Sequence, residues 1–70
     1  MTRLFTAIIE RDGDYYAAHC PDLDIASQGA TVAEARANLA EAIELFLETA
    51  SASEIKQRMH GEIYVTQVEV

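Results

Sequence analysis

His19 and Cys20 are neighbouring residues whose side chains could form a thiol nucleophile and its base. A catalytic cysteine needs a histidine within hydrogen-bond distance to accept its proton. Both residues fall in an alternating segment that predicts a strand, and successive side chains of a strand point to opposite faces. The two side chains cannot then reach each other, so we favour a half-buried strand cysteine over a thiol enzyme.

Four aspartates could instead gather a divalent metal ion. They are Asp12, Asp14, Asp22 and Asp24. A metal-dependent nuclease needs several carboxylates that converge on one Mg²⁺ ion. These four fall in predicted turns, where aspartate is common because it hydrogen-bonds the local backbone, and the only acid on a central-strand position is Glu10. We therefore expect no catalytic residue, no metal site and no cofactor.

Acidic residues also mark a face of a predicted helix, and this face could bind a basic partner. Its members are Glu34, Glu41, Glu44 and Glu48. Twelve acidic against five basic residues give a formal net charge of −7, which repels nucleic-acid phosphates and anionic lipids and favours a basic protein. Asp22 and Asp24 join these glutamates as candidate partner-binding residues. An ordinary solvated face, kept acidic for solubility, explains the pattern equally well.

Three short strands are expected before this helix. Alternating side chains predict each strand, and Asp12-Gly13 is a strong signal for a type I′ hairpin turn between the first two. Pro21 cannot donate a backbone hydrogen bond and should end the second strand. The strands are expected at residues 3–11, 14–20 and 24–29.

The helix is expected over residues 31–49. It begins with a capping box, in which Thr31 and Glu34 exchange hydrogen bonds between their side chains and backbone amides. An apolar stripe at helical spacing predicts that the helix packs on one face of the sheet. The stripe includes Leu39, Ile43 and Phe46.

Two further elements are expected after this helix. Ser51 or Ser53 could cap a short second helix, with a loop as the alternative. Residues 62–69 are rich in β-branched and aromatic side chains and predict a last strand. The main helix then acts as a right-handed crossover that returns this strand beside the first and parallel to it. The predicted fold is a single α+β domain over residues 1–70, of order β-β-β-α-β, with a four-stranded sheet in the order 3-2-1-4.

Self-association is expected because the core of so short a chain is marginal. A domain of this size buries only about 60% of its unfolded surface, and a lone Cys20 cannot form an internal disulfide. No cluster of cysteine and histidine offers a structural zinc site. We expect a homodimer or larger oligomer built on the apolar edge of the last strand, with Tyr64, Val65, Thr66 and Val68 as candidate interface residues.

The compartment is predicted from the start of the sequence. The first six residues lack the apolar segment and cleavage site of a signal peptide. No segment approaches the ~20 apolar residues of a membrane span. We therefore expect a cytoplasmic protein that binds neither membranes nor, on its own, nucleic acid.

Three motifs in this order resemble the HicB antitoxin family. They are DGDYYAAHCPDL at residues 12–23, SQGxTxxEA at 27–35 and NLxEA at 38–42. The resemblance covers roughly residues 8–48, and the last predicted strand extends it nearly to Val70. Many members have Leu-Pro-Gly-Cys where this chain has LDIA, at residues 23–26. The LDIA variant resembles short, stand-alone members of the family.

The resemblance implies both a fold and a partner. The fold is similar to part of the RNase H fold, in agreement with the predicted sheet order. HicB-like antitoxins neutralise a small basic ribonuclease toxin, HicA, by direct binding, and many carry a further DNA-binding segment that this sequence lacks. The alternatives are an orphan oligomeric interaction module without a toxin partner and, less favoured, a metal-dependent RNase H-like nuclease.

Overall fold

The first two strands form the expected hairpin. The computed structural model describes residues 3–70. In it β1 (Ile8–Asp12) pairs antiparallel with β2 (Tyr15–Cys20). Gly13 in the connecting turn has a φ of 67°, a left-handed conformation that glycine adopts without steric cost. The predicted hairpin is therefore confirmed, but its turn is not the predicted type I′. Asp12 pairs with Tyr15, so Gly13 and Asp14 are the central residues, and of these two only Gly13 has a positive φ, whereas a type I′ turn needs a positive φ at both.

A third strand completes the sheet. β3 (Ile25–Gly29) pairs antiparallel with β2, and the strand order is β1-β2-β3. The turn before β3 contains Asp24, whose φ of 56° reverses the chain direction. In the register, Ala18 faces Ile9 on one side and Ser27 on the other, which places these three side chains on the same face of the sheet.

Residues 3–7 lie outside β1, although their alternation predicts a strand from residue 3. Their partner would have to continue past Cys20, where Pro21 starts a turn. The amide of Thr6 donates instead to Oδ1 of Asp22, at 3.1 Å. The prediction therefore starts the first strand too early. Because β2 ends at Cys20, residues 3–7 have no neighbouring strand to pair with.

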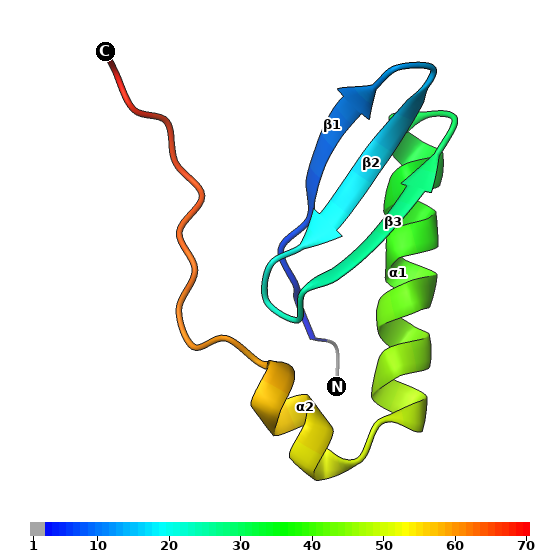
Figure 1. The fold of residues 1–70 in the computed structure, drawn as a ribbon, viewed down its shortest axis with the longest axis vertical. Helices are drawn as coiled ribbons and strands as arrows, with labels where there is room; N and C mark the ends of the chain where they lie inside the picture. Colours follow the sequence, from blue (N-terminus) through cyan, green and yellow to red (C-terminus); the bar gives the residue numbers. More distant parts are fainter. Residues whose placement is uncertain (1–2) are drawn as a thin grey trace.

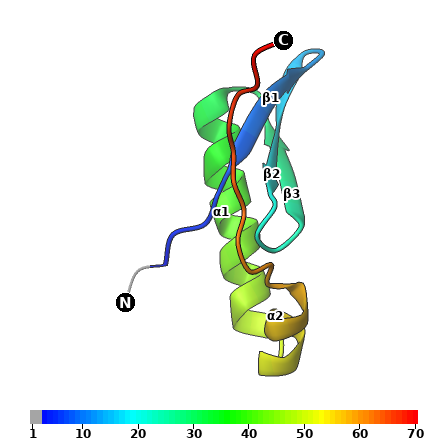
Figure 2. The same ribbon diagram turned by 90° about the vertical axis from the view of Figure 1, so that its left-hand side faces the viewer.

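The main helix, α1 (Val32–Thr49), covers one face of the sheet (Figures 1 and 2). The Thr31 hydroxyl accepts from the Glu34 amide at 3.0 Å. The Glu34 carboxylate accepts from the amide of Ala30, at 3.1 Å, one residue earlier than the capping-box pattern predicts. The start of the helix is confirmed, with this shift in one partner.

The core lies between α1 and the inner face of β2 and β3. Leu39 and Ile43 are buried as predicted, but Phe46 is only half-buried and packs against the edge of the core. Gly29 allows the helix to approach closely, because a Cβ at this position would lie 2.5 Å from the Ala35 nitrogen. The buried apolar residues are Ala18, Cys20, Leu23, Ala35, Leu39 and Ile43.

A second helix, α2 (Ala52–Arg58), follows at once. The Ser51 hydroxyl accepts from the Glu54 amide at 3.1 Å, which decides between the predicted short helix and a loop in favour of the helix. Arg58 donates to the carbonyl oxygens of Leu23 and Asp24 at 3.3 and 3.2 Å, and so ties α2 to the turn before β3. Within residues 3–70, no helix has both the length and the apolar character needed to cross a membrane.

Residues 62–70, named the arm below, are extended but belong to no strand. The predicted fourth strand is therefore not formed in this structure, and the order 3-2-1-4 is replaced by β1-β2-β3. Figures 1 and 2 show the arm leaving α2 and running along the free side of β1, in the same direction as β1 but apart from it. The β-branched composition makes the segment extended, but a strand also needs a hydrogen-bonded neighbour.

Candidate functional site

His19 and Cys20 lie on opposite faces of β2, as the strand geometry predicts. Cys20 is fully buried in the core, and burial raises the pKa of its thiol, so the thiol stays protonated at neutral pH. His19 lies on the other face, where its Nε2 is 3.1 Å from Oδ1 of Asp24. The two side chains therefore do not form a nucleophile and base.

The four aspartates are divided between two distant turns. Asp12 and Asp14 lie at the β1–β2 turn, whereas Asp22 and Asp24 lie at the other end of β2. Asp12 accepts a hydrogen bond from the Tyr15 hydroxyl at 3.2 Å. Among residues 3–70, no three histidine, cysteine, aspartate or glutamate side chains are grouped so that they could hold a metal ion.

The two candidate partner-binding aspartates make contacts within the protein. Asp22 is half-buried; its Oδ1 accepts from the Thr6 amide, and its carbonyl accepts from the His60 amide at 2.9 Å. Asp24 is exposed, and its hydrogen bond with His19 is the main cause that lowers the pKa of its carboxyl. Asp22 is thus a structural residue of the turn, and Asp24 is the one with an exposed carboxylate.

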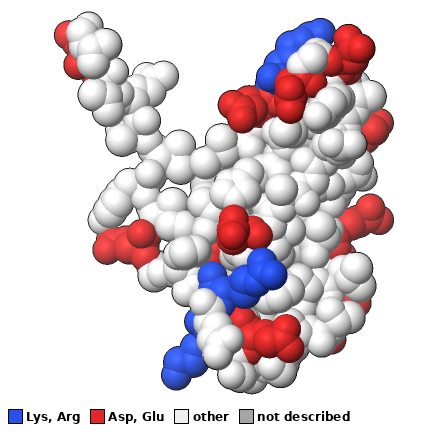
Figure 3. Space-filling model, in the orientation of Figure 1, with Lys and Arg blue, Asp and Glu red and all other residues white. Residues whose placement is uncertain are grey.

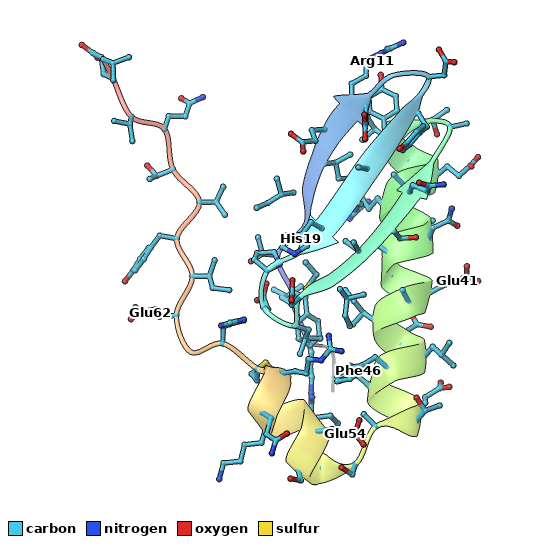
Figure 4. All side chains as sticks on the ribbon, viewed as in Figure 1. Arg11, His19, Glu41, Phe46, Glu54 and Glu62 are labelled. Atoms are coloured by element: carbon cyan, nitrogen blue, oxygen red, sulfur yellow. The ribbon has the colours of Figure 1, made fainter. Side chains whose placement is uncertain are left out.

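The helix glutamates are divided as well. Glu34 caps the start of α1, whereas Glu41, Glu44 and Glu48 surround a shallow hollow of about 400 Å³ with Leu45. Leu45 is 61% exposed. We name Glu41, Glu44, Leu45 and Glu48 the acidic patch. Figure 4 shows Glu41 pointing away from the sheet, so this patch faces outward.

The acidic patch has no basic side chain paired with it. Within residues 3–70, the only contact between oppositely charged groups within 4.0 Å is that of His19 with Asp24. Figure 3 shows acidic side chains along the rim formed by α1 with no Lys or Arg beside them in this view, whereas near the hairpin and α2 the Lys and Arg side chains lie among acidic ones. Three carboxylates around an exposed leucine can bind a surface that offers basic groups around an apolar one.

A second hollow lies where α1 faces residues 3–7. This open groove has a volume of about 590 Å³, and we name it the β1 groove. Two arginines, Arg3 and Arg36, line it together with Glu44. Its apolar lining includes Leu4, Phe5, Ala40, Ile43 and Leu47.

The predicted interface residues all lie on the arm and are exposed. Tyr64, Val65 and Val68 are 78%, 63% and 81% exposed, and Thr66 is exposed as well. The Tyr64 hydroxyl donates to Glu62 at 2.5 Å, and this hydrogen bond raises the pKa of the phenol. The arm therefore presents an apolar surface with no contact to cover it.

Sequence reasoning did not identify Leu45 or the β1 groove. Leu45 has a local signal, since it lies outside the apolar stripe of its helix, with Glu41 four residues before it and Glu48 three residues after it. The β1 groove has no local signal in the sequence, because Arg3 and Arg36 come together in it from segments far apart in the sequence.

The geometry thus offers one outward acidic patch, one apolar groove with two arginines and one uncovered arm. All three suit contacts with other proteins. No protein-family model, no curated protein and no solved structure matches the chain.

Proposed function

We propose that the chain is a cytoplasmic HicB-like antitoxin module that binds a small basic HicA-type ribonuclease toxin by direct contact. The observation that carries this proposal is the acidic patch, with three carboxylates free of basic partners around an exposed Leu45. A basic surface with a central apolar side chain complements such a patch in both charge and shape. The resemblance of residues 12–42 to HicB antitoxins supports the same class of partner.

The patch is positioned by the amphipathic pattern of α1. Leu39 and Ile43 anchor the helix on the sheet, and this turns Glu41, Leu45 and Glu48 to the solvent side. The glutamates attract a basic toxin over distance, and Leu45 adds apolar contact once the surfaces meet. Glu34 stays outside this set because its carboxylate caps the helix.

The finer fold class belongs to the same proposal. A partial RNase H-like sheet of order 3-2-1-4 requires a fourth strand beside β1, and the arm has the β-branched composition for it. The three-stranded sheet with α1 on one face provides the remaining parts.

The test is binding of the small basic protein encoded next to this chain. The neighbouring gene should encode a protein with a double-stranded-RNA-binding-like pattern and one key histidine. We expect the purified pair to form a complex that weakens as salt is raised. The double variant Glu41→Gln/Glu48→Gln should bind on the order of tenfold more weakly, since two charge contacts of up to ~1 kcal/mol each are lost.

A matched control carries the same change in net charge elsewhere. Glu10→Gln/Asp14→Asn alters two exposed carboxylates near the hairpin and should leave toxin binding unchanged. Equal weakening by both double variants would show that only net charge matters and would contradict a binding site on α1.

The proposed module acts by binding and not by catalysis. Purified protein with Mg²⁺ should not cleave RNA, and RNA cleavage that is lost in Asp22→Ala/Asp24→Ala would favour the nuclease alternative. The exposed apolar arm supports a second candidate, an interaction module that only associates with itself. A complete lack of binding to the neighbouring basic protein would favour that candidate.

A further inference from the structure

The arm is an apolar extended segment without a partner. Its described hydrogen bonds are internal, from Tyr64 to Glu62 and from the Thr66 hydroxyl to the Gln67 carbonyl. Four of its apolar side chains, those of Tyr64, Val65, Val68 and Val70, are largely exposed. Exposed apolar residues on an unpaired extended segment are typical of a strand that adds to the edge of a sheet.

The complementary edge lies on β1. Within the described part of the chain, β1 pairs with β2 alone, so its other edge keeps free backbone donors and acceptors. The β1 groove lies beside the residues that precede β1, between them and α1, and its lining includes Leu4, Phe5 and Leu47. Leu4 is 94% exposed. A strand added to β1 would pair with the edge and place alternate side chains in the groove.

Charge complementarity points to the arm as the occupant. The chain has only five Lys and Arg residues, and two of them, Arg3 and Arg36, line the β1 groove. The arm carries Glu62 and Glu69 on either side of its apolar residues. An acidic and apolar segment fits this groove better than the basic toxin does, because a basic protein would face the two arginines.

The lengths also agree. The nine residues of the arm span about 30 Å when extended, at about 3.3 Å per residue. Residues 3–12, which include β1 and the segment before it, have nearly the same number of residues. The arm is therefore long enough to span both β1 and residues 3–7, which line the groove.

The start of the arm is fixed to the turn before β3. The His60 amide donates to the Asp22 carbonyl at 2.9 Å, next to the Arg58 contacts with the same turn. A hollow of about 780 Å³ lies between Arg3, Leu4 and Phe5 on one side and α2 with the start of the arm on the other. Figure 4 shows Glu62 pointing away from the sheet at the point where the arm leaves the domain.

We propose that two copies of this chain exchange arms, so that residues 62–70 of each copy form the edge strand on β1 of the other. A two-fold axis perpendicular to the sheet reverses direction within it. Because the arm runs in the same direction as its own β1, the partner's arm then runs antiparallel to β1. Antiparallel pairing is slightly more stable per residue than parallel pairing. Each copy gives one arm and receives one, so the assembly closes as a dimer.

The exchange is independent of toxin binding. The acidic patch faces solvent from α1, while the exchanged arm lies at the β1 edge, with Glu44 alone lining both hollows. Failure of the toxin experiment would therefore leave the exchange intact, and failure of the exchange would leave the patch available.

The first test is the mass in solution. Light scattering at micromolar concentration should give twice the 7.7 kDa mass of one chain. Thr66→Pro removes a backbone donor in the middle of the arm and blocks strand pairing, and it should give a monomer with an unchanged circular dichroism spectrum of α1. The matched control, Thr66→Val, keeps the donor and should remain a dimer. A wild-type monomer, or a Thr66→Pro dimer, overturns the proposal.

A second variant tests the receiving side. Arg36→Glu reverses a charge on an exposed residue of the β1 groove and should weaken dimerisation on the order of tenfold, because an attraction becomes a repulsion. Unchanged dimerisation by this variant would contradict placement of the acidic arm in the groove.

The last test distinguishes a second copy from the chain's own arm. In a sample that mixes isotope-labelled and unlabelled protein, filtered nuclear Overhauser spectra report only contacts between copies. We expect contacts to Phe5 or Leu47 of one copy from one face of the other copy's arm, either from the Ile63 and Val65 methyl groups or from those of Val68 and Val70, because alternate side chains of a strand share a face. A monomer in which the same contacts occur within one chain would show that the arm closes on its own β1, and would overturn the exchange.

Discussion

Two halves of this molecule both contain many apolar residues, but these residues are buried in one half and largely exposed in the other. The packed half consists of β2, β3, the turn between them and α1, and it contains all six buried apolar residues found among residues 3–70. The open half consists of residues 3–12 and the arm, and none of its described residues is fully buried. Leu39 and Val68 illustrate the contrast, at 2% and 81% exposed.

The difference is the presence of a partner and not the residue type. In the packed half, α1 covers the inner face of β2 and β3, and Gly29 lets the helix come close. In the open half, β1 has one neighbour and the arm has none. Intrinsic β-propensity makes a segment extended, but burial supplies most of the stabilising free energy. The open half is therefore where association with another chain has the most to add.

The largest effect is expected from a truncation in the packed half. Leu39→Ala should lower the free energy of unfolding by about 2–5 kcal/mol, because it leaves a cavity in the core. Urea denaturation at low protein concentration measures the change. Leu45→Ala makes the same substitution on the same helix at an exposed position and should change stability by less than about 0.5 kcal/mol. Equal effects of the two variants would disprove the assignment of Leu39 to the core.

A somewhat smaller effect is expected where α1 approaches the sheet. Gly29→Ala places a methyl group 2.5 Å from the Ala35 nitrogen and should cost about 1–3 kcal/mol, since backbone must move. Gly61→Ala is the matched control, because a Cβ there meets nothing within 4 Å. If Gly29→Ala leaves the melting temperature as unaffected as Gly61→Ala does, the helix does not pack as closely as described.

Changes in the arm should hardly affect the single domain. At a protein concentration low enough to separate any dimer, Val68→Ser should alter the free energy of unfolding by less than about 0.5 kcal/mol, because its side chain is largely exposed. At high concentration the wild-type midpoint should rise with protein concentration, as binding to the folded state requires, and that rise should be reduced in the variant. A large loss of stability at high dilution would show that the arm packs on its own domain.

The smallest expected effect is electrostatic. The hydrogen bond with His19 lowers the pKa of Asp24 below its ordinary value of 3.8. A carboxyl with a lowered folded-state pKa stabilises the fold above the unfolded value, and this contribution is lost as the pH falls through the folded value. Nuclear magnetic resonance titration should show the Asp24 pKa rising toward 3.8 in His19→Gln. An unchanged pKa would mean that His19 is not its main partner.

The packed half was largely predictable because its signals are local. Asp12-Gly13 predicted the hairpin, Thr31 with Glu34 predicted the start of α1, and the apolar stripe predicted burial of Leu39 and Ile43. Phe46 shows that helical spacing alone does not predict full burial. It has the right spacing but lies near the end of α1, where the sheet no longer covers it and Arg58 stacks over its ring at 5.4 Å.

The candidate sites were less predictable. Glu41, Glu44 and Glu48 came together as helical spacing predicts, whereas Asp22 accepts hydrogen bonds from the distant residues Thr6 and His60. Leu23 is fully buried within the turn before β3, although turn residues usually lie on the surface and not in the core. The neighbours of a turn residue come from distant segments, and local patterns do not include them.

The sequence by itself determined the hairpin, the third strand, the main helix and the separation of His19 from Cys20, because these depend on dihedral preferences, caps and alternation within a few residues. The second helix was one of two alternatives until the structure showed it. Only the tertiary structure decided that pairing of the first strand stops at residue 8, that the arm leaves its own sheet unpaired, and that Arg3 and Arg36 share one groove. Each of these depends on where a second segment lies in space. Strand pairing and grooves are contacts between distant segments, so composition and periodicity of one segment cannot fix them.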